Sequence, residues 1–209
     1  MNLSARVAAF AATAVLLLGP IGARAAGSMP QDSLGPDGAA GAYCAQTGGH
    51  VETRIPEYGT NGPSPLVLSG SHKFCRYTSK SDHSRIYVFL DTLYTQQPTL
   101  AALAYYAQVQ PGQCNGNPAS CYCSLLGGTD LFGGVNAAGG AWVRNGGPDA
   151  DLDTCIFPDL SSIDSWGLTY HSQGIIRGID LSTVLRYPDP YAKTHDPGKL
   201  PNEKKAKSE

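Results

Sequence analysis

The sequence lacks the short motifs that usually mark a catalytic or cofactor site. It has no Cys-x-x-Cys or His-Glu-x-x-His frame for zinc, no Gly-x-Ser-x-Gly turn for a nucleophilic serine, no phosphate-binding glycine loop and no Cys-x-x-Cys-His haem attachment. These absences argue against the common metal, hydrolase, nucleotide and haem chemistries. We therefore expect a chain that is not an enzyme and has no catalytic residues, cofactor or metal of its own.

Charge is also scarce, with 15 basic and 17 acidic residues among 209. Removal of the expected signal segment takes away Arg6 and Arg24, which leaves 13 basic against 17 acidic residues and a net charge near -4. A chain without a basic excess is not expected to bind nucleic acid or an anionic membrane surface. We expect membrane contact only indirectly, through a protein partner.

No apolar run near the N-terminus is long enough for a permanent membrane helix. The run from Val7 to Leu18 has twelve residues, Arg6 precedes it, and Ala23-Arg24-Ala25 follows as a small-x-small cleavage site. This pattern predicts a signal peptide over residues 1–25, cleavage near Ala25, and location in the periplasm or outside the cell. No cysteine near the cleavage site offers a lipid anchor, and residues 26–36 read as a flexible leader.

What the sequence does hold is six cysteines, half of them within or just before one predicted helix. Asn117 can cap that helix, Pro118 fits its first position, and Gly127 or Gly128 can end it. An oxidising compartment favours disulfides over free thiols or zinc ligands. Six cysteines allow fifteen pairings.

The predicted helix has a weaker copy earlier in the chain. The offset is 79 residues from Tyr43 to Tyr122, Cys44 to Cys123 and Gly48 to Gly127, 80 from Cys75 to Cys155, and 81 from Leu100 to Leu181 and Tyr106 to Tyr187. Such regular spacing indicates a duplicated unit. The repeat pairs Cys44 with Cys75 and Cys123 with Cys155, and it leaves Cys114 and Cys121 for each other.

From this repeat we predict an α+β fold of two tandem small disulfide-bridged units, each with a short N-terminal helix, a small antiparallel sheet and a C-terminal helix. Residues 86–94 read as a strand or extended stretch, and Thr169-Tyr170 read as the end of another strand. The expected divisions are a first unit at 37–107, a linker at 108–116, a second unit at 117–187 and a disordered tail at 188–209 that could order on a partner.

Part of the second unit resembles a known family. Asn117-Pro118-Ala119-Ser120-x-Tyr122-Cys123, followed by Cys155 beside Pro158-Asp159, is similar to the Asn-Pro-Ala-Ser-x-Tyr-Cys signature of small exported bacterial domains of unknown function, often labelled haemolysin. The likeness covers roughly residues 117 to 170, and the first unit would be a diverged copy. The resemblance implies a small disulfide-bridged α+β domain and no mechanism that can be transferred to named residues.

Several residue groups allow a chemical interpretation beside a structural one. Cys121 and Cys123 could form a redox or metal pair, but residues two apart on a helix point in different directions. Three neighbours in the sequence, His72, Cys75 and His83, could hold zinc. For acid–base chemistry, His171 could act with Asp159 or Asp164. Trp142, Trp166 and the eleven tyrosines are expected mainly in the core and at its rim.

The leading functional hypothesis is a non-catalytic accessory or assembly subunit of a larger periplasmic or membrane-bound complex, with a quinoprotein-type dehydrogenase as one candidate host. A protein partner is expected, and its identity stays open. The alternative is a secreted effector or inhibitor of the haemolysin type, which predicts an exposed apolar patch. A third hypothesis is a hydrolase or redox enzyme with an unfamiliar site.

Overall fold

The computed structural model describes residues 37–130, 137–144, 146 and 149–192. The expected signal peptide and leader lie outside these residues, as does the part of the expected tail from 193 to 209. The helices are α1 (Gly38–Gln46), α2 (Leu90–Tyr94), α3 (Leu100–Ala107), α4 (Pro118–Leu125), α5 (Ser165–Ser172) and the short 3-10 helix η2 (Leu181–Thr183). The strands are β1 (His50–Tyr58), β2 (Leu66–Val67), β3 (His72–Thr78), β4 (Arg85–Phe89), β5 (Gly140–Val143), β6 (Asp151–Leu152), β7 (Thr154–Ile156) and β8 (Ser162–Asp164).

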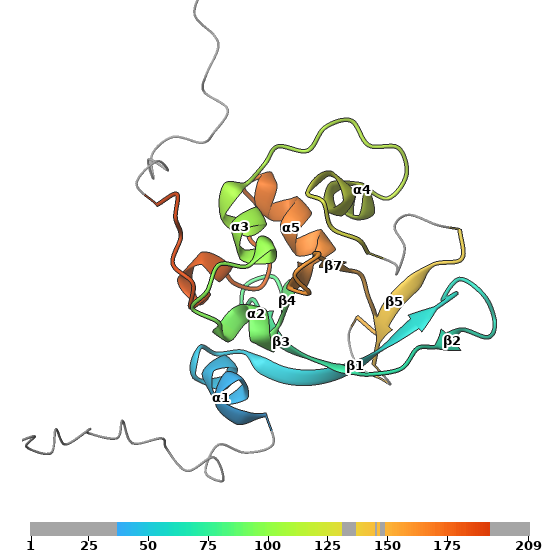
Figure 1. Ribbon diagram of the computed structural model, residues 1–209, viewed down its shortest axis with the longest axis horizontal. Coiled ribbons are helices and arrows are strands. Elements are labelled where there is room, and N and C mark those ends of the chain that lie inside the picture. The colour runs from blue at the N-terminus through green and yellow to red at the C-terminus, as the bar shows by residue number, and fades with distance from the viewer. Residues whose placement is uncertain (1–36, 131–136, 145, 147–148, 193–209) are drawn as a thin grey trace, which may run out of the picture.

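The eight strands of the described residues belong to one antiparallel sheet. Its order is β6-β5-β1-β3-β4-β8-β7, and β2 pairs with β1 beside the end of β3. The two outermost strands, β6 and β7, are neighbours in the chain, with only Asp153 between them. The sheet therefore curls round and is nearly closed, and its strands surround the centre of the molecule (Figure 1).

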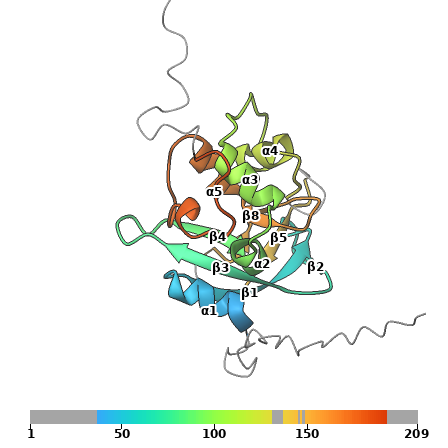
Figure 2. The ribbon, with the colours of Figure 1, turned by 60° about the vertical axis from the view of Figure 1, so that its left-hand side comes forward.

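The outer face of this sheet packs against the helices. Cys75 and Tyr77 of β3 point to this face, and helices α3, α4 and α5 gather at the end of the molecule opposite α1 (Figures 1 and 2). The buried core there includes residues from both halves of the chain: Cys44, Cys75, Tyr77, Ile86, Val88, Leu93, Tyr105, Tyr122, Cys123, Cys155, Ile163, Leu168 and Leu181.

The inner face of the sheet holds a second, smaller core. It consists of the buried residues Phe74, Tyr87, Phe89, Trp142 and Leu152, with Ile156 packed against them. The ring of Phe74 meets Phe89 and Trp142 edge-on, at centroid distances of 4.7 and 5.7 Å. Trp142 is thus a core residue, as the sequence predicts, whereas Trp166 is half-buried on α5.

The prediction of two tandem units, each with its own sheet, is wrong. Strand β1 of the first expected unit pairs with β5 of the second, and Val88 of β4 pairs with Ile163 of β8. A separate first unit would leave β1 and β4 as open sheet edges, which expose unpaired backbone groups. Joining the strands of both halves in one sheet satisfies those groups and builds one shared core.

The two disulfide-bonded helices nevertheless have the same local geometry. Gly49 N donates to Cys44 O at 2.8 Å, and Gly128 N donates to Cys123 O at 2.9 Å. The preceding glycines, Gly48 and Gly127, have φ of 87° and 83°, a conformation that favours glycine. Each helix thus turns directly into the sheet, where a disulfide joins it to a strand.

Two element predictions also need correction. Residues 86–94 do not continue as one extended stretch, because the chain turns into α2 at Leu90. The stretch ending at Thr169-Tyr170 is helix α5, and it is not a strand. The side chain of Asp164 caps α5 by accepting a hydrogen bond from Gly167 N at 3.0 Å.

Candidate functional site

All six cysteines are in disulfides, so the structure assigns them a bracing role. The pairs are Cys44–Cys75, Cys114–Cys121 and Cys123–Cys155, which are the pairs that the repeat predicts. Cys121 and Cys123 do not bond each other. Three disulfides indicate an oxidising, extracellular-type compartment. Loops of 31 and 32 residues closed in this way stabilise a chain by roughly 3 to 4 kcal/mol each in the chain-entropy picture.

The residues of the zinc interpretation have separate surroundings. Cys75 is bonded to Cys44 and has no free thiolate, while His83 is exposed in the turn between β3 and β4, with φ of 59°. The His72 ring stacks on Phe89 at a centroid distance of 4.6 Å. His72 also borders an open cavity of about 290 Å³, lined by Asp37, Ala40, Ser71, His72, Lys73, Phe89, Leu90 and Asp91.

The residues of the acid–base interpretation each serve a different part of the fold. Asp159 accepts hydrogen bonds from Leu100 N at the start of α3 and from Ser161 Oγ, at 2.7 and 2.6 Å. Asp164 caps α5. The His171 ring is buried, stacks on Tyr105 at 3.7 Å and has Nε2 3.0 Å from Gln108 Nε2. Asp159 and Asp164 therefore serve as helix caps, and His171 is a core residue.

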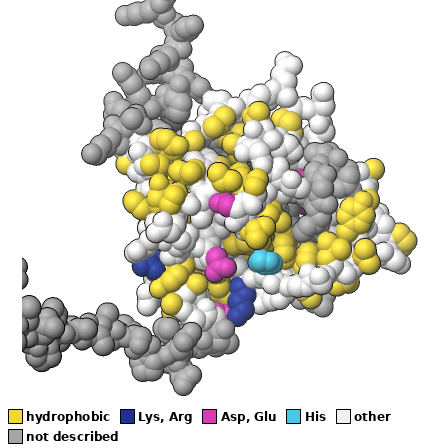
Figure 3. Space-filling model, viewed as in Figure 1, with side chains coloured by type: hydrophobic (Ala, Val, Ile, Leu, Met, Phe, Trp, Pro, Cys, Tyr) yellow, Lys and Arg dark blue, Asp and Glu magenta, His cyan; other side chains and the backbone are white. Residues whose placement is uncertain are grey.

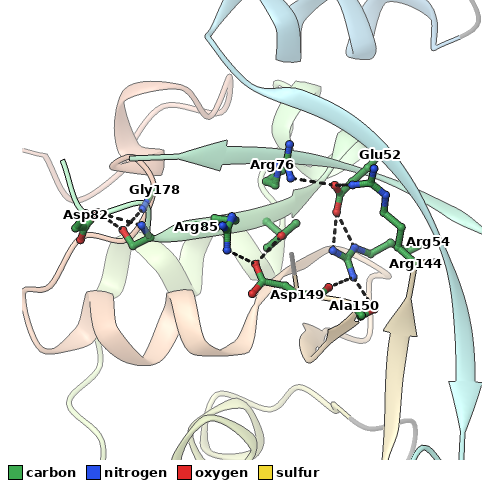
Figure 4. A network of polar contacts seen from close by, with 11 residues as sticks. Glu52, Arg54, Arg76, Asp82, Arg85, Arg144, Asp149, Ala150 and Gly178 are labelled. Carbon is green, nitrogen blue, oxygen red and sulfur yellow. Dashed lines mark hydrogen bonds and ion pairs between the residues drawn. The ribbon is translucent and has the colours of Figure 1, made fainter. Parts of the chain in front are cut away.

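A buried ion network that sequence reasoning missed lies on the inner face of the sheet (Figure 4). The fully buried Arg54 contacts Glu52 Oε1 from Nη2 at 2.6 Å, and Arg144 contacts Glu52 Oε2 at 2.7 Å. Arg76 adds a longer ion pair to Glu52 at 3.8 Å. Arg54 Nη1 also donates to the Trp142 and Asp149 carbonyl oxygens, at 2.9 and 2.7 Å. The network joins β1, β3 and β5 and braces the curl of the sheet.

A second buried polar cluster contains acids that form no salt bridge among the described residues. Asp130 is 1% exposed, and burial raises the pKa of its carboxyl. Burial, together with the negative charges of Asp130 and Asp151, raises the pKa of Asp153 to about 6. Burial likewise raises the pKa of Asp164 to about 7, although Gly167 N and the charge of Arg177 act in the opposite direction. These acids lie where β6, β7, β8 and α5 meet.

The exposed apolar residues of the sheet gather at the end of β1 and on β2, which we call the apolar ribbon: Ile55, Tyr58, Leu66 and Val67. Their exposed fractions are 42, 39, 63 and 60%. Leu66 pairs with Tyr58, and Val67 pairs with Glu57. By the strand register, Ile55 and Val67 lie on one face of the sheet, and Tyr58 and Leu66 lie on the other. Figure 3 shows hydrophobic side chains gathered over this end of the sheet. The apolar ribbon is the candidate functional site because apolar surface of this kind marks contact sites.

None of the helices in the described ranges has both the length and the apolar character that crossing a membrane requires. No protein-family model, no curated protein and no solved structure matches the chain.

Proposed function

We propose that this chain is a non-catalytic exported accessory subunit that docks on a larger protein complex, in the periplasm or outside the cell, through the apolar ribbon. The single observation that carries the proposal is the exposure of Leu66 and Val67 on an edge strand. Among the described residues, β2 pairs only with β1, so its outer edge has free backbone donors and acceptors. An extended segment of a partner could pair with this edge while its side chains cover the ribbon.

A protein partner fits the ribbon better than a lipid surface. The chain has a formal net charge of -2, which gives no attraction to anionic lipids. Glu57 lies between the ribbon residues along β1 and pairs with Val67, so a carboxylate would enter the bilayer interface with them. A strand edge, in contrast, offers directional hydrogen bonds that a protein segment can use. A quinoprotein-type dehydrogenase remains one candidate host.

The interface can be tested with a charged double variant, Leu66→Lys with Val67→Lys. The full chain, carrying a C-terminal affinity tag, is purified from native membranes and its partners are identified by mass spectrometry. We expect the double variant to lose at least about tenfold of the partner recovered with the wild type, because two lysines cannot be desolvated in an apolar contact. Leu125→Lys is the matched control, since Leu125 is 53% exposed on α4.

Three results would contradict the proposal. The double variant could recover the partner as well as the wild type does, or the control could lose it equally. The wild type could also fractionate alone. Lysis of vesicles or cells by the purified chain, abolished by the same double variant, would instead favour the effector alternative of the haemolysin type.

A further inference from the structure

The second buried cluster leaves several polar atoms without partners. Neither carboxylate oxygen of Asp130 and neither hydroxyl of Ser120 or Ser165 has a hydrogen bond among the described residues. Both serines are fully buried, and Asp130 is 1% exposed. A buried polar atom without a partner destabilises the fold, so native proteins rarely gather four of them in one place. A ligand bound by all four oxygens would satisfy them together.

Three separate elements bring these oxygens together. Ser120 lies on α4 and Ser165 begins α5, while Asp130 follows Thr129, which is held to Ile156 by hydrogen bonds of 2.8 and 2.9 Å. Burial raises the pKa of the Asp130 carboxyl, and the hydroxyls of Ser120 and Ser165 oppose this rise because they lie within hydrogen-bonding reach of it. Neither hydroxyl, however, has the distance and angle of a regular hydrogen bond to the carboxyl. Oxygens bound to a common Ca²⁺ at 2.3–2.6 Å are commonly about 3 to 4.5 Å apart, which is wider than a hydrogen bond.

A second acid lies beside the same position. Asp153 O accepts a hydrogen bond from Ser165 N at 3.1 Å, which places its backbone beside the cluster, and the charge of Asp130 acts on its carboxyl. By contrast, the buried Glu52 pairs with arginines, and the half-buried Asp37 pairs with Lys73. In the part of the chain that the structure describes, no ion pair includes Asp130 or Asp153.

We propose that Asp130 and Asp153, with the hydroxyls of Ser120 and Ser165, form a binding site for a hard cation. Of the common hard cations, Ca²⁺ fits this set of ligands best. Carboxylate and hydroxyl oxygens are ligands for hard cations, whereas all six cysteines are in disulfides and offer no thiolate. Ca²⁺ accepts irregular oxygen geometry more readily than Mg²⁺ does. Among the described residues, no three His, Cys, Asp or Glu side chains lie together in a way that could hold a metal ion. The protein would therefore supply two carboxylates and two hydroxyls, and water would complete the coordination.

With only two carboxylates, the site should have the low affinity of extracellular calcium modules, with a Kd on the order of 10⁻⁴ to 10⁻³ M. The test is thermal unfolding of the full exported chain, disulfides intact, in EDTA and in 10 mM CaCl₂ at pH 7.5. A cation that binds only the folded state should raise the wild-type Tm by about 3 to 10 °C. Isothermal titration with CaCl₂ should give one site per chain.

Asp130→Asn removes the central charge while keeping the shape of the side chain. We expect this variant to lose the calcium-dependent shift and to unfold in EDTA at or above the wild-type temperature, because a neutral amide is easier to bury than a carboxylate. Ser120→Ala should weaken calcium binding about threefold or more without any charge change. Asp91→Asn, which alters an exposed acid of α2, should keep the full shift.

The proposal is wrong if wild-type Tm is the same in EDTA and CaCl₂, or if Asp130→Asn retains the shift. It is also wrong if Asp91→Asn loses as much of the shift as Asp130→Asn, since that result would mark general screening of surface charge. The unfolding temperature of Asp130→Asn in EDTA separates a lost binding site from a misfolded variant, because a folded variant keeps a cooperative transition.

Discussion

In β1 charged residues are buried, and apolar or uncharged residues are exposed. Val51, Thr53 and Ile55 give the apolar alternation that predicts a strand, yet Thr53 and Ile55 are exposed. The buried positions are Glu52 and Arg54. Their burial depends on partners far along the chain, such as Arg144 in the loop after β5. The local pattern therefore predicts the strand but gives no sign that its charged residues are buried.

Replacement of Glu52 tests whether this network stabilises the fold. Glu52→Gln would leave the fully buried Arg54 without its counter-charge, and breaking a buried pair in this way typically costs about 3 to 5 kcal/mol. We expect urea unfolding to show a loss of that size. Asp37→Asn is the matched control, because the Lys73–Asp37 pair is partly exposed and such pairs contribute about 0 to 1 kcal/mol. Equal losses in the two variants would show that the buried network has no special role.

At the level of elements, the local sequence predicts helices that have clear start and stop signals and misses helices that lack them. The predicted start of α4 is confirmed, since Asn117 Oδ1 accepts from Ala119 N at 2.9 Å and Pro118 occupies the first turn. Helix α5 contains glycine, threonine and aromatic residues, which are weak helix formers, and six of its eight residues are buried. Its stability comes from packing, which local sequence does not reveal.

The double-glycine turns after α1 and α4 are a second test at this level. A Cβ atom on Gly49 would lie 2.2 Å from Cys75 Sγ, and one on Gly128 would lie 2.3 Å from Cys155 Sγ. Gly49→Ala and Gly128→Ala should therefore each force the helix away from its disulfide and cost about 1 to 3 kcal/mol in urea unfolding.

Gly112→Ala is the control for these two variants, because nothing lies within 4 Å of the added Cβ. We expect its free energy of unfolding to change by no more than about 0.5 kcal/mol. If the three alanine variants are equally stable, the turns have more room than the structure gives them, and the glycines are not required for the disulfide contacts.

For the whole molecule, the sequence repeat predicts the disulfides but not how the halves combine. Pairing of β1 with β5 and of β4 with β8 joins residues 75 to 90 positions apart, and no local pattern encodes such contacts. The candidate sites were hidden for the same reason. Asp130 and Ser165 belong to no motif, and the Asn-Pro-Ala-Ser signature that contains Ser120 assigns it no role. Only the fold shows that their side chains converge.

The buried acids give the molecule an unusual dependence of stability on pH. Burial raises the pKa of Asp153 to about 6 and that of Asp164 to about 7, whereas both titrate near 3.9 in an unfolded chain. Between about pH 4 and 7 the folded state therefore holds protons that the unfolded state has released. The stabilisation is fully present below the unfolded pKa and is lost as pH rises through the folded pKa.

We predict that the free energy of unfolding, measured by urea in EDTA, falls by about 2 to 3 kcal/mol from pH 5 to pH 7.5 through Asp164 alone. Asp164→Asn keeps an acceptor for Gly167 N but cannot ionise. Its free energy of unfolding should therefore change between pH 5 and pH 7.5 by about 2 to 3 kcal/mol less than that of the wild type. Asp82→Asn is the control, because hydrogen bonds from Ser79 and Ser84 lower the pKa of this exposed acid to about 2, well below the interval. A wild type that is equally stable at both pH values, or an Asp164→Asn variant with the wild-type slope, would mean that the acid is already ionised in the folded protein near pH 5.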